Sequence, residues 1–278
     1  MKNNYAQTYA TNRLSLCKII YKVISNSNTI KPYKMISETL ALHYNGLSHC
    51  PICNKKYNDK FMKTGKNYPV ITEKQIIGGG ERYTRCPICQ SNERQRLTYL
   101  FLSNIFRTNN SKRLKVIHIA PEKCLSSYLS KLDNIEYIKG DLFCSGYKYP
   151  ADVINLDLMN LALETNSVDV FICNHVLEHV QDDIRCMREI YRVLKPGGIA
   201  VLQVPYSLNT EHTIRDKVSS NNERIAKYGQ RDHVRLFGMD YPNLLESVGF
   251  KVYPYKPDKN TTVYLHLNPN ETLWTVQK

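Results

Sequence analysis

The sequence predicts an α/β protein in which a doubly wound, mostly parallel sheet follows a small cysteine-rich module. From residue 112 onward, short runs of β-branched residues alternate with helical segments. Such alternation is typical of a parallel sheet with helices on both faces. Ahead of this region the tetrapeptide CPIC occurs twice, and hydrophobic residues make up 42% of the chain, which is enough to build a packed core.

The two CPIC sequences predict a structural metal site. Cys50 and Cys53 form the first pair, Cys86 and Cys89 form the second, and 32 residues separate the two pairs. Each pair supplies two thiolates from one tight turn, so both pairs together complete a tetrahedral site for zinc or a similar soft metal. Four cysteine ligands leave no open coordination position, which makes the site structural. The odd total of nine cysteines argues against a disulfide scaffold.

Seven short apolar runs form the predicted sheet. In chain order they are LKVIHIA, IEYIKGDL, ADVINLD, VDVFICN, GIAVLQVP, FKVYPY and ETLWTVQK. A helix is expected from about Glu93 to Phe106, and further helices in CMREIYRVL and YPNLLESVG, because apolar residues recur there at helical spacing. The last two runs are close enough in the chain to pair as an antiparallel finish.

The N-terminal segment is basic and partly apolar. Residues 14–25 place apolar side chains at helical spacing around Lys18 and Lys22. This pattern predicts an amphipathic helix that either makes peripheral contact with a membrane or packs on the protein itself. No small-residue cleavage site follows, so a signal peptide is not expected. No apolar run reaches the roughly eighteen residues of a membrane span, and we expect a cytoplasmic location.

The charge balance is strongly basic, with a net charge of +13 and a pI of about 9.2. A basic chain favours acidic partners, which include nucleic acid, anionic glycans, nucleotide sugars and membrane surfaces. The alternative is a basic surface that is merely solvated, since net charge alone does not define a site.

The segment VDVFICNHVLEHVQDDIRCMREIYRVLKPGGIAVLQVP resembles the class I S-adenosylmethionine-dependent methyltransferases, because strand, helix, Pro-Gly-Gly turn and strand occur in order. The resemblance covers about residues 112–278. The whole layout also resembles a bacterial group with a CPxC-SxER zinc knuckle, often associated with cell-surface polysaccharide genes. Cys86–Arg94, His118–Glu122 and Gln230–Tyr241 carry that second resemblance.

The resemblance implies a Rossmann-like, doubly wound seven-stranded methyltransferase sheet preceded by a zinc-ribbon-like module. Three segments follow from it. Residues 1–48 form the basic helical arm, residues 49–108 the zinc-knuckle module with its linking helix, and residues 109–278 the methyltransferase domain.

Residues at the strand ends are the expected cofactor contacts, because open α/β sheets bind ligands there. By the resemblance, Asp141 after the second strand binds the ribose hydroxyls of S-adenosylmethionine. Asp157 binds the adenine amine, with the Leu158 backbone beside it. Asn174 and His175 end the fourth strand beside the sulfonium. The alternative for the two aspartates is helix capping.

The corner after the first strand departs from the family pattern. The family has a glycine-rich loop that lets the backbone approach the cofactor closely, whereas this chain reads HIAPEKCLSSYL. Ala120, Pro121 and Glu122 occupy the corner, and proline cannot donate a hydrogen bond. We expect these residues to contact the cofactor but to hold its methionine tail differently.

The sequence His175-x-x-Glu178-His179 allows several interpretations. A zinc protease would need the motif inside a long helix, but here it follows a strand. Ubiquinone-type O-methyltransferases and plant small-RNA 2′-O-methyltransferases resemble this segment and use Glu-x-x-Glu-His to hold a divalent ion. On a helix, His175, Glu178 and His179 would share one face. By that resemblance these three residues hold a second divalent metal, with His175 in place of the first Glu, and His233 is the best candidate to complete the set. Without metal, His175 or His233 is a candidate general base, and Glu178 and His179 could instead stabilise a helix start.

A long polar segment, residues 206–240, follows the fifth strand and is expected to form an acceptor lid. Its candidate side chains are Tyr206, His212, Arg215, Arg224, Arg231, His233 and Arg235. The first hypothesis is an enzyme that methylates an oxygen of a sugar, nucleotide-sugar or glycan precursor in polysaccharide biosynthesis. The alternatives are a zinc-containing RNA methyltransferase and a non-catalytic methyltransferase fold used for binding.

Overall fold

The computed structural model describes residues 48–57, 61–109, 111–215, 217 and 220–278. The helix expected at residues 14–25, and with it nearly all of the proposed N-terminal arm, lies outside this range. Among the described helices, none has both the length and the apolar character needed to cross a membrane.

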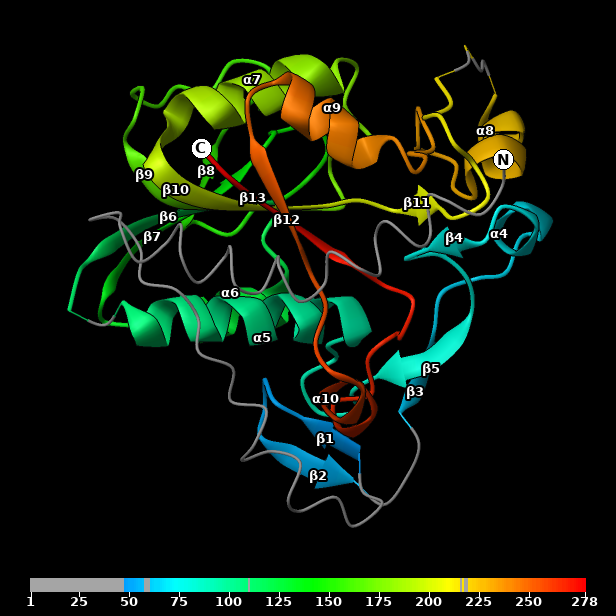
Figure 1. The fold of residues 1–278 in the computed structure, drawn as a ribbon, viewed down its shortest axis with the longest axis horizontal. Coiled ribbons are helices and arrows are strands. Elements are labelled where there is room, and N and C mark those ends of the chain that lie inside the picture. Colours follow the sequence, from blue (N-terminus) through cyan, green and yellow to red (C-terminus); the bar gives the residue numbers. More distant parts are fainter. Residues whose placement is uncertain (1–47, 58–60, 110, 216, 218–219) are drawn as a thin grey trace, which may run out of the picture.

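A seven-stranded mixed sheet forms the centre of the molecule (Figure 1). Its order is β12-β13-β10-β9-β6-β7-β8, where β13 runs antiparallel to both neighbours and the other neighbouring pairs are parallel. The bounds are β6 Leu114–Ile119, β7 Ile135–Asp141, β8 Val153–Asn155, β9 Val168–Asn174, β10 Leu194–Gln203, β12 Lys251–Tyr255 and β13 Leu273–Gln277. The seven-stranded, doubly wound sheet and its antiparallel finish are confirmed.

The chain changes direction across the sheet between β6 and β9. It first builds outward from β6 through β7 to β8, and then returns to the other side of β6 to form β9 and β10. Two crossovers therefore leave neighbouring strands in opposite directions, which opens a crevice outside their carboxyl ends. This point fixes where a ligand can enter the fold.

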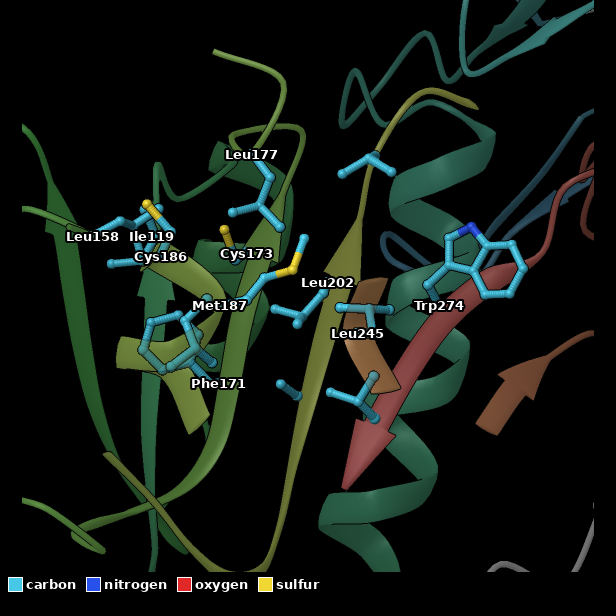
Figure 2. Packing of buried hydrophobic residues seen from close by; sticks show 14 of the residues in the cluster. Ile119, Leu158, Phe171, Cys173, Leu177, Cys186, Met187, Leu202, Leu245 and Trp274 are labelled. Atoms are coloured by element: carbon cyan, nitrogen blue, oxygen red, sulfur yellow. The ribbon is translucent and has the colours of Figure 1, made fainter. Parts of the chain in front are cut away.

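Helices cover both faces of the sheet (Figure 1). Helices α7 (Asp183–Val193) and α9 (Tyr241–Ser247) pack on one face, and α5 (Glu93–Thr108) and α6 (Lys123–Leu129) on the other. Strand β9 serves both layers, because Phe171 and Cys173 join the first core while Val170 and Ile172 join the second. Figure 2 shows Phe171, Met187, Leu202 and Leu245 in the first core.

Helix α5 begins where the sequence expects it and ends two residues later than the predicted Phe106. The Asn92 side chain accepts a hydrogen bond from the Gln95 backbone, and the Gln95 side chain accepts one from the Asn92 backbone. This capping box satisfies two of the free N–H groups that every helix start leaves. Although the sequence assigned α5 to the cysteine-rich module, its apolar side packs on the sheet.

The cysteine-rich module consists of short elements around the two knuckles. A hairpin of β1 and β2 carries the first knuckle, and β3 pairs with β5 before the second. Strand β4 pairs with β11, which lies just after β10, so the module also touches the long polar segment. The bounds are β1 Ser48–Cys50, β2 Lys55–Tyr57, β3 Met62–Thr64, α4 Pro69–Glu73, β4 Ile76–Ile77, β5 Arg82–Arg85, β11 Tyr206–Ser207, α8 Asn221–Tyr228 and α10 Lys259–Tyr264.

The fully buried Arg96 joins this module to the rest of the chain. Its guanidinium donates four hydrogen bonds to backbone carbonyls, and it lies 4.4 Å from the ring centroid of Phe61. The four acceptors are the carbonyls of Leu265, Thr84, Ser91 and His266, at 2.8–3.0 Å. Burial lowers the pKa of Arg96, while the negative potential of the nearby cysteine thiols and Glu93 opposes that shift.

We predict that Arg96→Met lowers the free energy of unfolding by about 3–5 kcal/mol, because four carbonyls lose a charged donor and stay buried. Urea denaturation measures the loss. Arg107→Met is the matched control on the same helix, because Arg107 is exposed, and we expect it to change stability by no more than about 0.5 kcal/mol. Equal effects of the two substitutions would contradict the linking role of Arg96.

Candidate functional site

The carboxyl edge of the sheet gathers the side chains that the sequence assigned to the cofactor. Asp141 and Asn174 are the last residues of β7 and β9, and Ala120 directly follows β6. Asp157 stands two residues after the end of β8. Parallel strands end on one edge, so these residues lie around the crevice between β6 and β9. Their contact with a cofactor stays a prediction.

The corner after β6 adopts a backbone conformation that favours glycine. Ala120 has φ +48°, in the left-handed region, and its N–H donates to the Gly140 carbonyl at 2.8 Å. An L residue in this region loses about 1–2 kcal/mol relative to right-handed backbone. The corner therefore keeps the glycine-type turn although its sequence contains no glycine, and alanine tolerates it because its side chain is a single methyl group.

A polar network holds the next residue of the corner in place. One carboxylate oxygen of Glu122 lies 2.7 Å from His118 Nε2, and the other accepts from Asn174 Nδ2 at 3.1 Å. His118 is fully buried, and its Nδ1 lies 2.9 Å from the Tyr137 hydroxyl. The network connects β6, β7 and β9, so the Ala-Pro-Glu corner is rigidly attached to the sheet.

The two strand-end aspartates differ in their local contacts. Asp141 Oδ1 accepts from the Leu142 N–H at 2.8 Å, and burial raises the pKa of its carboxyl group. Asp157 Oδ1 accepts from the Met159 N–H at 2.8 Å, closing a local turn. Leu158, which lies between Asp157 and Met159 in this turn, is buried in the core. Neither aspartate caps a described helix, so the helix-cap alternative is wrong for both.

The His-x-x-Glu-His segment is not helical, which corrects two sequence-based expectations. Residues 175–181 form turns after β9, and α7 begins only at Asp183, with the Asp182 side chain as its cap. His175 itself has φ +55°. The motif therefore neither shares a helix face nor stabilises a helix start. The turn runs between the end of β9 and the residues that precede α7.

Three side chains nevertheless converge beyond β9. Glu178, His179 and His233 each offer one ligand atom, and these atoms lie within 4.8 Å of one another. The rings of His179 and His233 are 4.9 Å apart, and His179 Nδ1 lies 3.1 Å from the Asp232 carbonyl. Glu178 Oε2 and His233 Nδ1 are buried and have no hydrogen-bond partner among the described residues. Buried polar atoms without a hydrogen-bond partner are suited to bind a cation or to accept a proton.

Burial shifts the pKa values of both Glu178 and His233. It raises the pKa of Glu178 to about 8. It lowers the pKa of His233 to about 4, helped by the adjacent His179 and opposed by Asp232 and a hydrogen bond to the Tyr228 backbone. At neutral pH His233 is therefore a neutral imidazole with a free lone pair.

His175 is not a member of this cluster. Its Nδ1 lies 3.2 Å from Arg94 Nη1 and 3.5 Å from Glu178 Oε1. Because a guanidinium can only donate, Nδ1 accepts, and a neutral ring then carries its proton on Nε2. Burial lowers the pKa of His175 well below its usual value. His233 therefore joins Glu178 and His179, as the sequence expected, whereas His175 does not.

The long polar segment contains buried as well as exposed groups. Arg235 is buried and donates to the carbonyls of Leu177 and Gln181, and Arg215 pairs with Asp183 at 2.6 Å. The segment borders a cleft of about 650 Å³. The lining residues are Gln181, Asp182, Asp183, Ile184, Arg215, Lys217, Arg224, Tyr228, Val234 and Arg235. His212 and Arg231 are exposed and Tyr206 is buried, and none of them lines the cleft.

The four knuckle cysteines converge as the spacing predicts. The Sγ atoms of Cys50 and Cys89 are 3.5 Å apart, and those of Cys53 and Cys86 are 3.7 Å apart. Thiolates around a tetrahedral zinc with bonds of about 2.3 Å lie about 3.8 Å from one another. The cluster geometry therefore fits a zinc ion.

Sequence reasoning missed several residues at the edge of the sheet. A cavity of about 110 Å³ is lined by Asn92, Arg94, Gln95, Thr98, Glu122, Asn174, His175 and Gln203. Gln203 ends β10 and could have been found by the strand-end rule that identified Asn174. Glu271, whose pKa burial raises to about 7, accepts from Gln203 Nε2 at 3.1 Å. The α5 residues gave no such signal, because only the fold brings them to this edge.

We predict that Ala120→Gly raises the free energy of unfolding by about 0.5–1 kcal/mol, because glycine adopts φ +48° without the strain of a Cβ atom. Chemical denaturation measures the change. Ala226→Gly in the exposed part of α8 is the control, and we expect it to lower stability by about 1 kcal/mol. A destabilising Ala120→Gly would mean that the corner is not strained.

Two comparisons with known proteins agree with this architecture. Residues 125–202 match a family described as "Methyltransferase domain". A protein of Mycolicibacterium smegmatis named "Probable S-adenosylmethionine-dependent methyltransferase" is 28% identical over 106 residues, which are 38% of this chain. The matched region spans 37% of that relative's length.

Solved structures provide a further comparison. A SAM-dependent methyltransferase from Archaeoglobus fulgidus has 18% identity and a TM-score of 0.43, covering 66% of this chain and 94% of the other. One from Mesorhizobium loti has 15% identity and a TM-score of 0.41, covering 60% and 92%. Because these scores are low, the assignment rests on the strand order and the matched sequence segment. On that basis residues 125–202 are similar to a methyltransferase domain, and part of the chain is similar to an S-adenosylmethionine-dependent methyltransferase.

Proposed function

We propose that the protein transfers the methyl group of S-adenosylmethionine to a hydroxyl oxygen of a sugar or glycan precursor. The observation that carries the proposal is the convergence of Glu178, His179 and His233 just beyond β9. By family resemblance, the reactive methyl group lies beside the end of this strand. An acceptor hydroxyl placed between the methyl group and these side chains can lose its proton to one of them.

The reaction is an in-line displacement, in which the acceptor oxygen forms a bond to the methyl carbon as the sulfonium bond breaks. Most of the acceleration comes from alignment of oxygen and methyl group. The proton of the hydroxyl needs an acceptor, and Nδ1 of neutral His233 supplies one, since it has no hydrogen-bond partner in the described part of the chain. The imidazole is unprotonated at neutral pH and can therefore accept the proton, and its pKa of about 4 makes it a weaker base than an ordinary histidine.

Glu178, His179 and His233 also fit a divalent cation. One carboxylate and two imidazoles form a ligand set that transition metals accept. A bound cation would attract the acceptor hydroxyl and lower its pKa. The two functions use the same three residues, so a metal-dependent and a metal-free reaction differ in whether His233 binds the cation or the proton.

The basic cleft supports a phosphorylated acceptor. Its volume of about 650 Å³ is in the range of small-molecule sites. Four cationic side chains line it, and Asp183 pairs with Arg215 and Arg235, which leaves Lys217 and Arg224 without an ion pair among the described residues. Nucleotide sugars combine a compact size with phosphate charge, and arginine pairs well with phosphate oxygens.

We further propose that the four knuckle cysteines hold a structural zinc ion. Their Sγ spacing supports a tetrahedral site, and no coordination position remains open. A zinc tetrathiolate has a net negative charge, which would stabilise the buried guanidinium of Arg96 together with the nearby Glu93 carboxylate. The zinc would thus stabilise the contact between the module and the end of α10.

We predict that S-adenosylhomocysteine binds the zinc-replete protein with micromolar or tighter affinity, measured by calorimetric titration. Asp141→Ala should weaken binding about 10- to 100-fold, because the ribose hydroxyls lose a charged acceptor. The exposed Asp133→Ala is the control and should bind normally. A well-folded protein that does not bind would favour the non-catalytic alternative.

We also predict two separable metal sites. Purified protein should retain about one zinc per chain, and Cys86→Ser should lose it. Added Mn²⁺ should bind once more, and Glu178→Gln should abolish Mn²⁺ binding without loss of zinc, as paramagnetic resonance and elemental analysis would measure. Glu246→Gln, an exposed carboxylate on α9, is the control. Unchanged Mn²⁺ binding by Glu178→Gln would leave only the metal-free reaction.

A further inference from the structure

Residues from α5 and from the strand ends line one small cavity together. Arg94, Asn92, Gln95 and Thr98 come from the start of the helix that follows the second knuckle, and Glu122, Asn174, His175 and Gln203 come from the edge of the sheet. We propose that this cavity receives the amino-acid end of the cofactor, with Arg94 binding its carboxylate and Asn174 its ammonium group. The proposal rests on the proposed function, since it takes S-adenosylmethionine as the ligand.

Arg94 supplies the positive side of the cavity. Its Nη1 donates to the Gly78 carbonyl at 3.0 Å and lies 3.2 Å from His175 Nδ1. These contacts hold the guanidinium in place, yet its Nε is buried and has no partner among the described residues. No described carboxylate forms an ion pair with it. A guanidinium fixed in this way, with a free N–H, is prepared to bind a carboxylate through charge-assisted hydrogen bonds.

Close backbone approach keeps Arg94 at this position. Gly78 has φ +87°, and a Cβ atom there would lie 3.4 Å from both Arg94 Nη1 and His175 Cε1. The triple-glycine linker of the cysteine-rich module thus packs directly against the cavity wall. The module contributes to the site through both the linker and α5.

Asn174 supplies a hydrogen-bond acceptor to the same cavity. Its side chain is 6% exposed, and its Nδ2 donates to Glu122 at 3.1 Å, which fixes the orientation of the amide. The Oδ1 atom has no hydrogen-bond partner among the described residues, so it remains an acceptor. The adjacent Glu122 carboxylate adds negative charge. An ammonium group can therefore donate to both residues.

The size and charge of the cavity favour an amino-acid head group over other ligands. A volume of about 110 Å³ holds several water-sized groups but not a nucleoside. A cation and a hydrogen-bond acceptor that line the same cavity match the two charged groups of a zwitterion. The amide N–H groups at the start of α5 add positive potential on the carboxylate side.

This arrangement explains how the corner functions without the family's glycine-rich loop. Pro121 has no N–H, and the Ala120 N–H already donates to Gly140. The corner therefore has few free backbone donors for a carboxylate. Side chains from α5 take over that task, so the cysteine-rich module becomes part of cofactor binding as well as a structural support.

Calorimetric titrations with S-adenosylhomocysteine and with 5′-methylthioadenosine test the assignment, because the second ligand lacks the amino-acid portion. We expect Arg94→Met to weaken S-adenosylhomocysteine binding about 10- to 100-fold and to change methylthioadenosine binding less than about twofold. Arg94→Lys keeps the charge but not the planar fork, and should lose affinity for S-adenosylhomocysteine to a smaller degree. Arg107→Met, an exposed arginine of α5, should change neither affinity.

Two results would overturn the assignment while leaving the proposed function intact. One is unchanged S-adenosylhomocysteine binding in Arg94→Met. The other is an equal loss for both ligands in Arg94→Met and Arg94→Lys, which would mean that Arg94 only shapes the site. Wild-type protein that binds neither ligand would instead overturn the proposed function, and the assignment with it.

Discussion

A parallel sheet must be covered on both of its faces, and this requirement organises the molecule. The central strands are apolar on both sides, so water has to be excluded from each. Helix α5 covers one face, and because it runs back along the strands its first turn reaches the carboxyl edge. The second knuckle directly precedes that turn. The cysteine-rich module is therefore placed at the site by the packing of α5.

The carboxyl edge combines strained backbone with a polar network that holds it. Ala120 and His175 both have positive φ angles, and both flank the crevice between β6 and β9. His118, Glu122 and Asn174 connect the surrounding strands through buried hydrogen bonds. Strain of this kind persists where neighbouring contacts fix the backbone. The result is a rigid floor for a ligand rather than a loop that must order on binding.

Charge is distributed according to distance from the core. Arg96 and Arg235 are buried and donate to backbone carbonyls, so they hold segments together. Lys217 and Arg224 line the wider cleft, where they can meet an anionic acceptor. Near the end of β9, burial keeps His233 neutral at physiological pH. The basic residues of the chain therefore have different roles, and the net charge does not show which residue has which role.

The sequence by itself determined the sheet, its antiparallel finish and the pairing of the two cysteine knuckles. Alternating apolar runs and repeated CPIC tetrapeptides are local patterns, and each reflects a local physical requirement. The strand-end rule also located Asp141, Asp157 and Asn174 at one edge.

Only the tertiary structure decided which residues meet across long sequence separations. It kept His233 with Glu178 and His179 but left His175 out of that cluster, because residues 175–181 form turns instead of a helix. It brought Arg94 within 3.2 Å of His175, although 81 positions separate them in the chain. Periodicity reports which face of an element is buried, whereas contacts between distant loops depend on how the elements pack. For that reason the sequence alone defined the edge of the sheet, and the fold supplied the cavity.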